Sequence, residues 1–263
     1  MIHNKILSEI APFKSSFFEK RVYWVTGAGT GYGKVIAQAL AFLGANVIIS
    51  SRRKTALQEC KQDINLNNLD ILVCDITNNN SIDYAIEYIK NNYGKCDGII
   101  HSAALPPDDT KTYPLLDSSF DELLSILHTN TLAPWYISKT IIDKNIYAES
   151  FRTIFISSEA GFSCKTLSSG IYNLSKTALN SMASSLALEI EAKYKNEDIQ
   201  FNTLVADVAL SEMNPNSDTS PTIIINMVLK LLTQPKGKPN GMFFHSNGEN
   251  LYFLNRDKHE RIL

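Results

Sequence analysis

The sequence lacks a long apolar run and a charge excess of either sign. No stretch approaches the roughly 20 consecutive apolar residues that a membrane-spanning helix needs. The N-terminus has neither the basic segment nor the apolar core of a secretory signal. The formal net charge of −2 at pH 7 gives no reason to expect a nucleic-acid partner. We therefore expect a cytoplasmic protein that binds neither membranes nor nucleic acids.

Cysteine and histidine are scarce and scattered. The five histidines do not cluster, and no C-x-x-C pair occurs. Widely spaced cysteines of this kind are typical of free thiols in a reducing compartment. The pattern predicts neither a disulfide framework nor a metal site. The cysteines are Cys60, Cys74, Cys96 and Cys164.

The chain does contain a regular alternation of strand-like apolar runs and helical patterns. Its 263 residues, 44% of them hydrophobic, can bury the core of one large α/β domain. The alternation predicts a single doubly wound Rossmann-type domain over residues 21–263, with a central parallel sheet flanked by helices. A long helix is predicted from about 118 to 143. Strands are predicted at 21–25, 45–50, 70–74, 96–100, 153–156, 199–205 and 241–244.

Residues 1–20 precede the first predicted strand and form an N-terminal arm. Apolar spacing predicts an amphipathic helix in this arm, and Pro12 must kink or end it because proline has no N–H to donate. We expect the arm to pack on the body of the domain or on a neighbouring subunit. The apolar positions are Ile6, Ile10, Phe13 and Phe17.

A glycine-rich turn follows the first predicted strand. Residues 26–33 read Thr-Gly-Ala-Gly-Thr-Gly-Tyr-Gly, and apolar residues then recur with helical spacing. Strand, glycine-rich turn and helix are the context of a dinucleotide fingerprint, in which backbone N–H groups approach a pyrophosphate at the positive end of the helix. In another context the glycines would form an ordinary flexible turn. Here we predict a dinucleotide cofactor.

Arginines follow the second predicted strand, where an acid is usual. An NAD-binding site commonly places a carboxylate there to hold the ribose 2′-hydroxyl, whereas this chain has Ser51, Arg52 and Arg53. A guanidinium can hold a 2′-phosphate through two parallel hydrogen bonds. The pattern favours NADP(H), with NAD(H) as the alternative cofactor and a solvated arginine pair as the structural alternative.

Two more strand ends carry candidate cofactor contacts. Asp75 follows the third predicted strand and could accept a hydrogen bond from an adenine amino group, with an N-cap near Ser81 as the competing interpretation. Small residues at 102–104 follow the fourth strand and leave room for a ligand beside the backbone. For the lone His101 we favour a structural role.

A serine pair and a Tyr-Lys pair are the candidates for chemistry. Ser157 and Ser158 end the apolar run at 153–156, and Tyr172 and Lys176 lie four residues apart in a helical pattern. Residues i and i+4 share a helix face, so both side chains can point into one cleft. A nearby ammonium would lower the pKa of the phenol from its free value of about 10. A buried tyrosine beside a surface lysine is the structural alternative.

Asn130 lies inside the predicted helix 118–143, shortly before Pro134. Asparagine is a poor helix former and proline disturbs the hydrogen-bond ladder, so we expect a kink here. A polar side chain at a kink that faces the Tyr-Lys cleft could hold a water molecule. A core amide satisfied by the backbone explains the residue equally well.

Together these motifs resemble the classical short-chain dehydrogenase/reductase family over residues 22–253. The family's T-G-x-x-x-G-x-G motif matches Thr26, Gly27, Gly31 and Gly33. Its adenine-binding acid matches Asp75, and its four catalytic positions match Asn130, Ser158, Tyr172 and Lys176. Ser158 fits better than Ser157, because the family's serine normally lies just before the small loop residues. The resemblance implies a cofactor bound by Gly27, Thr30, Gly31, Tyr32, Gly33, Ser51, Arg52, Arg53, Asp75, Ile76, Ser102, Ala103, Ala104, Tyr172, Lys176, Ala209 and Ser211.

The chain departs from the family pattern at two places. The family's N-N-A-G after the fourth strand reads His-Ser-Ala-Ala at 101–104, and Ala206-Asp207 replaces the Pro-Gly after the sixth strand. Both changes concern the nicotinamide end of the site and leave the four catalytic positions intact. Asp207 is also a candidate substrate contact.

The resemblance implies hydride transfer between NADP(H) and a small-molecule carbonyl or secondary alcohol. In this scheme Tyr172 exchanges a proton with the substrate oxygen, and Ser158 hydrogen-bonds that oxygen. Lys176 favours the phenolate and binds the nicotinamide ribose, while Asn130 anchors a water of the proton relay. Such proteins are commonly homodimers or homotetramers. Two other functions remain open: a cofactor-binding sensor or scaffold without net redox chemistry, and an epimerase or dehydratase on the same scaffold.

Overall fold

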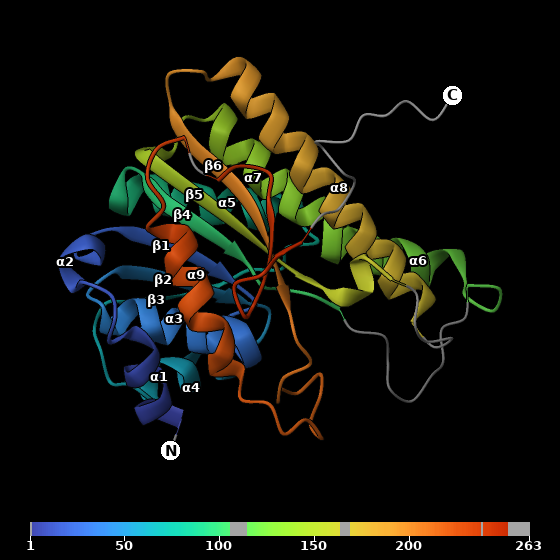
Figure 1. Cartoon of the computed structure of the whole chain (residues 1–263), viewed down its shortest axis with the longest axis horizontal. Helices are drawn as coiled ribbons and strands as arrows, with labels where there is room; N and C mark the ends of the chain where they lie inside the picture. Colours follow the sequence, from blue (N-terminus) through green and yellow to red (C-terminus); the bar gives the residue numbers. More distant parts are fainter. Residues whose placement is uncertain (1, 106–114, 164–168, 238, 252–263) are drawn as a thin grey trace.

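An eight-stranded sheet runs through the centre of the molecule (Figure 1). The computed structural model describes residues 2–105, 115–163, 169–237 and 239–251, so Cys164 and the end of the predicted domain lie outside the described residues. The strand order is β3-β2-β1-β4-β5-β6-β7-β8, and neighbouring strands are parallel except β7 and β8. This order confirms the predicted Rossmann-type fold. The strands are β1 (Val22–Thr26), β2 (Asn46–Ser51), β3 (Leu69–Val73), β4 (Cys96–His101), β5 (Tyr147–Ser158), β6 (Asp198–Ala206), β7 (Phe243–His245) and β8 (Asn250–Leu251).

Helices cover both faces of the sheet and divide the core into two layers (Figure 1). One layer packs the sheet against α1 (Ile2–Ile10), α3 (Gly31–Phe42), α4 (Lys54–Gln62) and α9 (Ile225–Leu232). The other packs it against α5 (Asn79–Tyr93), α7 (Ala133–Asp143) and α8 (Gly170–Lys193). The strands are apolar on both faces because each face meets helices, as expected of a parallel sheet. The chain passes from β1 to β2 and β3 on one side, and then from β3 back across to β4 on the other side of β1, so β1 and β4 border the switch point of the fold.

The N-terminal arm packs on the body of the subunit. Helix α1 ends at Ile10, before Pro12, and the short helix α2 (Ser15–Phe18) follows. Ile6 and Ile10 are buried in the same core layer as α3 and α9. Helix α1 therefore contributes apolar surface to the domain core.

The long predicted helix is divided into three parts. Helix α6 (Phe120–Leu127) begins with a capping box in which Ser119 and Glu122 hydrogen-bond each other's backbone N–H groups. A π-helical turn over His128–Leu132 follows and leads into α7, which has Pro134 in its first turn. The predicted kink is therefore a π-turn around Asn130. Such turns often occur at functional sites.

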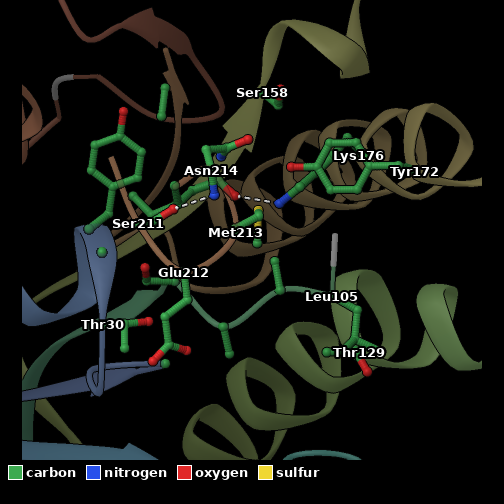
Figure 2. Close-up of a pocket in the computed structure, with 18 of the residues that line it drawn as sticks. Thr30, Leu105, Thr129, Ser158, Tyr172, Lys176, Ser211, Glu212, Met213 and Asn214 are labelled. Carbon is green, nitrogen blue, oxygen red and sulfur yellow. Dashed lines mark hydrogen bonds between the residues drawn. The ribbon is translucent and has the colours of Figure 1, made fainter. Parts of the chain in front are cut away.

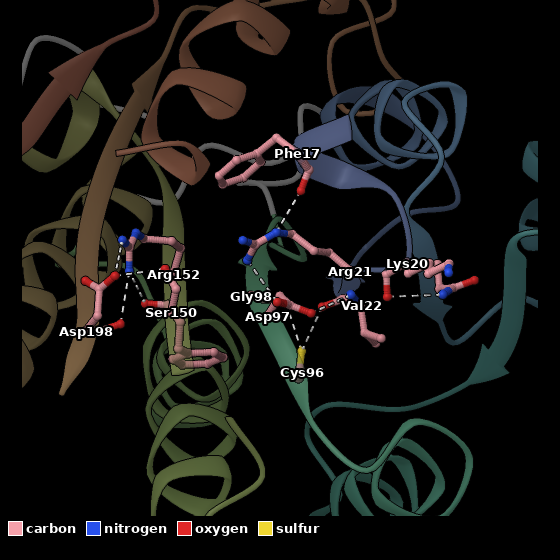
Figure 3. Close-up of polar contacts among 12 residues, drawn as sticks. Phe17, Lys20, Arg21, Val22, Cys96, Asp97, Gly98, Ser150, Arg152 and Asp198 are labelled. Carbon is pink, nitrogen blue, oxygen red and sulfur yellow. Dashed lines mark hydrogen bonds and ion pairs between the residues drawn. The ribbon is translucent and has the colours of Figure 1, made fainter. Parts of the chain in front are cut away.

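Ion pairs lie near the amino-terminal ends of the central strands (Figure 3). The Arg21 guanidinium lies 3.0 Å from the Asp97 carboxylate, which also accepts a hydrogen bond from the N–H of Val22 at 2.8 Å. Arg152 is 3% exposed and lies 2.8 Å from the carboxylate of Asp198. These pairs connect neighbouring strands at the edge of the sheet opposite the carboxyl ends.

The described cysteines agree with the prediction of free thiols. Cys60, Cys74 and Cys96 are buried, and burial raises the pKa of the Cys60 and Cys96 thiols to about 12. Within the described residues, no three histidine, cysteine or acidic side chains are grouped so that they could hold a metal ion. No helix in the described part of the chain is long and apolar enough to span a membrane.

Candidate active site

A cavity of about 790 Å³ opens at the carboxyl ends of the parallel strands (Figure 2). Its walls come from the glycine-rich turn after β1, the residues that follow β2, β3, β4 and β6, the end of β5, and the first turns of α8. Open α/β sheets bind ligands at this edge. Each predicted cofactor-binding residue except Gly33 lines the cavity, as do three of the four predicted catalytic residues. Asn130 is the fourth, and it lies behind the wall.

The glycine-rich turn is packed so closely against its neighbours that side chains would not fit at two of its glycines. Gly27 has φ +68°, and a Cβ placed on it would lie 2.6 Å from the backbone of Ala103. A Cβ on Gly33 would lie 2.4 Å from the carbonyl oxygen of Gly27, so Gly33 serves close packing of α3 against the turn. Thr30 occupies the N-cap of α3 without a side-chain capping bond. The positive end of this helix therefore faces the cavity with its first amides uncapped by Thr30.

The two arginines after β2 differ in their contacts. Both line the cavity and are exposed. Arg53 forms an ion pair with Glu212, which also raises the pKa of Arg53 through the hydrogen bond between them. Arg52 has no ion-pair partner among the residues that the structure describes. Of the two arginines predicted to bind a phosphate, Arg53 is thus already paired with Glu212, and Arg52 is unengaged, with no ion-pair partner among the described residues.

Asp75 stabilises a turn at the end of β3. Its carboxylate accepts hydrogen bonds from the N–H of Thr77 at 2.9 Å and from the Thr77 hydroxyl at 2.7 Å. Burial raises the pKa of Asp75, but these bonds and the charge of Arg52 outweigh it, so the pKa is lowered overall. The N-cap of α5 is Asn78, whose side chain accepts from the N–H of Ser81. The alternative of Asp75 as the N-cap is therefore wrong.

The end of β4 carries a buried histidine, and the residues that follow it form part of the cavity wall. His101 is 3% exposed, its Nε2 lies 3.0 Å from the Ser138 hydroxyl, and its ring stacks on Phe155 with centroids 5.0 Å apart. Burial lowers the pKa of His101 to about 3. The predicted structural role agrees with these contacts. Residues 102–104 line the cavity, and the N–H of Ala103 donates to the Thr26 hydroxyl at 3.4 Å.

Tyr172 and Lys176 lie side by side on the cavity face of α8, as their spacing predicts (Figure 2). The Lys176 Nζ lies 5.6 Å from the centroid of the Tyr172 ring and donates to the carbonyl oxygen of Ile156 at 2.9 Å. Burial lowers the pKa of Lys176 to about 8. Burial raises the pKa of Tyr172 to about 12, and a hydrogen bond with Ser158 opposes this increase only partly. The predicted lowering of the phenol pKa by Lys176 is therefore wrong for this geometry, because the ammonium group bonds a strand carbonyl.

The two serines at the end of β5 have different environments. Ser157 is buried, and its hydroxyl donates to the side-chain oxygen of Asn180 at 2.7 Å. Ser158 is half-buried at the cavity wall, where its hydroxyl accepts from the N–H of Ala160 at 3.3 Å. The Ser158 hydroxyl also hydrogen-bonds with the Tyr172 side chain, so the two groups lie next to each other at the wall. Both serines line the cavity, and Ser158 is the more exposed of the two.

The Asn130 side chain is fully hydrogen-bonded within the protein. Its oxygen accepts from the N–H of Leu105 at 2.8 Å, and its nitrogen donates to the Leu105 carbonyl oxygen and the Ser175 hydroxyl, both at 3.0 Å. These contacts agree with the second interpretation of Asn130, an amide whose hydrogen bonds are satisfied inside the protein. The side chain connects the segment after β4 to α8, next to Lys176. It therefore supports two parts of the cavity wall.

The segment after β6 contributes contacts that local motifs did not reveal. The Tyr32 hydroxyl donates to the carbonyl oxygen of Asp207 at 2.8 Å. The Asp207 carboxylate accepts a hydrogen bond from Ser246 and lies 3.4 Å from Nε2 of His245. Glu212 lines the cavity and pairs with Arg53, a residue 159 positions earlier. The sequence carries no local signal for such a long-range pair.

Comparisons with known proteins agree with this geometry. The family model of the short chain dehydrogenases matches residues 21–221. An uncharacterized oxidoreductase of Staphylococcus aureus (strain USA300) is 29% identical over 219 residues, which cover 82% of this chain and 92% of the relative. An actinorhodin polyketide ketoreductase structure with NADPH has a TM-score of 0.74 at 17% identity, covering 86% of this chain and 95% of that one. A structure from Shigella flexneri 2a str. 301 complexed with NADP has a TM-score of 0.75 at 23% identity, covering 89% and 100%.

The structural neighbours support the fold, and the family model covers most of the chain. The matched region contains the glycine-rich turn, Ser158, Tyr172 and Lys176. This chain belongs to the short-chain dehydrogenase/reductase family, whose members are NAD(P)-binding oxidoreductases.

Proposed function

We propose that this protein is an NADP(H)-dependent oxidoreductase that interconverts a carbonyl compound and a secondary alcohol, with Tyr172 as the acid/base. The observation that carries the proposal is that one cavity contains both the glycine-rich turn and the trio of Ser158, Tyr172 and Lys176. A dinucleotide on the turn can reach these side chains, because they belong to the same continuous wall.

The residues present fit a dinucleotide. Gly27, Gly29 and Gly31 line the cavity without side chains, which allows a pyrophosphate to approach the backbone, and the start of α3 favours negative charge there. Asp75 and Ile76 line the adenine end, and residues 102–104 line the opposite wall. When bound, the cofactor supplies or accepts the hydride.

The preference for NADP(H) rests on charge. No carboxylate follows β2 directly, and the unengaged guanidinium of Arg52 faces the cavity. A guanidinium favours a 2′-phosphate over a hydroxyl because it can form paired, charge-assisted hydrogen bonds. The ketoreductase and the Shigella flexneri structure named above hold NADPH and NADP, respectively, which supports the same preference.

The side chains around Tyr172 suit proton donation. A phenol whose pKa is raised to about 12 stays protonated at neutral pH and can donate to a developing alkoxide. Ser158 orients the substrate oxygen by a hydrogen bond. The Lys176 amine, anchored to the carbonyl oxygen of Ile156, lies at the same cavity wall and is the candidate contact for the nicotinamide ribose. Asn130 acts as a positioning residue through Leu105 and Ser175.

The decisive experiment uses the variant Tyr172→Phe, which keeps the ring and removes the hydroxyl. We expect NADPH affinity to remain within about twofold and turnover on a responsive carbonyl substrate to fall about 100- to 10,000-fold. Substrates are first found by screening carbonyl compounds for loss of reduced-nicotinamide absorbance. Undiminished turnover in the variant would contradict the role of Tyr172. Tight NADPH binding without turnover on any carbonyl compound would favour the scaffold function instead.

A further inference from the structure

The ion pair between Arg53 and Glu212 joins two distant parts of the cavity wall. Arg53 is the N-cap residue of α4, two positions after the end of β2, and Glu212 belongs to the segment after β6. Both side chains line the cavity, and both are more than half exposed. Figure 2 shows Glu212 on the side of the cavity where Thr30 marks the start of α3.

The local fold holds Glu212 at this position. The N–H of Leu210 donates to the carbonyl oxygen of Thr219 at 2.8 Å, and the Ser217 hydroxyl donates to the Val208 carbonyl oxygen at 2.8 Å. The segment is thus closed on itself by hydrogen bonds on both sides of Glu212. Ser211, the residue before Glu212, lies against the glycine-rich turn. A Cβ placed on Gly31 would be 3.1 Å from the Ser211 Cβ.

An exposed ion pair of this kind contributes little to folding stability. Its effect on a ligand can be larger, because Arg53 is one of the two guanidinium groups beside the cofactor ribose in the proposed function. A guanidinium that is bound to a carboxylate has fewer N–H groups to offer to a phosphate. A carboxylate at the same place also repels a phosphate dianion.

We propose that Glu212 is a specificity-determining residue that weakens binding of the 2′-phosphate by competing for Arg53. The competition is selective: a cofactor with a 2′-hydroxyl does not need Arg53 and leaves the ion pair intact. Arg52 then supplies the main attraction for the 2′-phosphate, and Glu212 sets how strongly NADP(H) is preferred over NAD(H). This inference rests on the proposed binding of a nicotinamide dinucleotide in the cavity.

The experiment measures dissociation constants of NADPH, NADH and 2′,5′-ADP for the whole chain and for Glu212→Gln. We expect Glu212→Gln to bind NADPH and 2′,5′-ADP about three- to tenfold more tightly, with NADH changed less than about twofold. The matched control is Glu189→Gln, an exposed glutamate that pairs with Lys193 on α8 away from the cavity wall. That control is expected to leave all three constants unchanged. An unchanged ratio of NADPH to NADH affinity in Glu212→Gln overturns the proposal.

A second variant separates this inference from the proposed cofactor preference. Arg53→Gln is expected to weaken NADPH and 2′,5′-ADP, and adding Glu212→Gln to it should give a smaller gain than in the native chain, because the two residues are coupled. Weaker NADPH binding in Arg53→Gln with no effect of Glu212→Gln would overturn only the role of Glu212. If neither Arg53→Gln nor Arg52→Gln changes the NADPH to NADH ratio, the proposed NADP(H) preference fails as well. Thermal unfolding of each variant verifies that it is folded.

Discussion

The two ends of the central sheet use charged residues in opposite ways. At the amino ends, Arg152 is almost fully buried and donates to the carboxylate and the carbonyl oxygen of Asp198 (Figure 3). It also donates to the carbonyl oxygens of Phe151 and Gln234. At the carboxyl ends, Arg52 is exposed at the cavity wall without an ion-pair partner among the described residues. The first arrangement stabilises the fold, and the second leaves a guanidinium available to a ligand.

This difference teaches that the type of residue does not distinguish a structural charge from a functional one. Arg152 directly precedes the apolar run at 153–156, and Arg52 follows the apolar strand at 45–50, so both lie beside strand-like sequence. The distinguishing feature is how many of the donor groups are satisfied within the protein. Substitutions at the amino ends should therefore change the free energy of unfolding, and substitutions at the carboxyl ends should change binding or turnover.

The largest effect on stability is expected from Arg152→Gln. The substitution leaves the Asp198 carboxylate, 13% exposed, without its guanidinium, and removes a donor from the carbonyl groups of Phe151, Asp198 and Gln234. Breaking a buried pair on one side costs about 3–5 kcal/mol of unfolding free energy. The matched variant Arg52→Gln should change it by less than about 0.5 kcal/mol. Urea denaturation of both variants measures the difference, and equal losses would remove the distinction between the two ends.

The next effect concerns the pH dependence of stability at the carboxyl end. Burial lowers the pKa of Lys176 from its ordinary value of 10.5 to about 8. Between these two pH values the unfolded chain holds a proton that the folded chain has released, so this residue makes the unfolding free energy rise with pH. Below pH 8 the burial of the charged ammonium form lowers the unfolding free energy by about 3 kcal/mol relative to a neutral amine at the same place.

Lys176→Met removes this titration. The unfolding free energy of the variant, minus that of the native chain, should be largest at pH 7 and smallest near pH 10.5, and it should decrease steadily between these pH values. Urea denaturation of both proteins at several pH values measures that difference and cancels the titration of other groups. Curves that stay parallel from pH 7 to pH 10.5 would show that the Lys176 amine is not destabilised by burial.

The smallest effects should come from Ser157 and Ser158, which allow a structural and a functional role to be compared at two neighbouring positions. Ser157→Ala leaves the buried side-chain oxygen of Asn180 without its donor and should cost about 1–2 kcal/mol of unfolding free energy, with turnover nearly unchanged. Ser158→Ala should leave stability within about 0.5 kcal/mol and lower kcat/KM about tenfold or more. Denaturation and steady-state kinetics on both variants test the pair. The reverse pattern would transfer the catalytic role to Ser157.

The sequence was sufficient to predict the fold and the position of the cavity because each signal was local. The glycine-rich turn after β1 and the Tyr-Lys spacing on α8 each lie within one contiguous motif. Strand β8 was missed, although Asn247 and Gly248 form a dipeptide typical of hairpin turns and Gly248 has φ +92°. Strand β5 begins at Tyr147, well before the predicted start at 153. The prediction started too late because charged and polar residues interrupt the apolar pattern in the first half of the strand.

The parts of the site that the sequence could not predict depend on directions in space. The pKa of Tyr172 depends on where the Lys176 amine points, and the carbonyl oxygen of Ile156 determines that. The partners of Asn130 come from two other segments of the chain. The pairing of Arg53 with Glu212 likewise requires the fold of the segment after β6. Composition and periodicity contain none of this information.

The last described strands have a consequence for dissecting the chain. The family model ends at residue 221, yet β7 extends the sheet beside β6, and Ser246 and His245 hold the carboxylate of Asp207 at the cavity wall. A fragment trimmed to the matched residues would expose the backbone edge of β6 and strip Asp207 of both side-chain partners. An expression fragment should therefore retain the chain through residue 251, because the hairpin of β7 and β8 supplies the residues that hold Asp207 at the cavity wall.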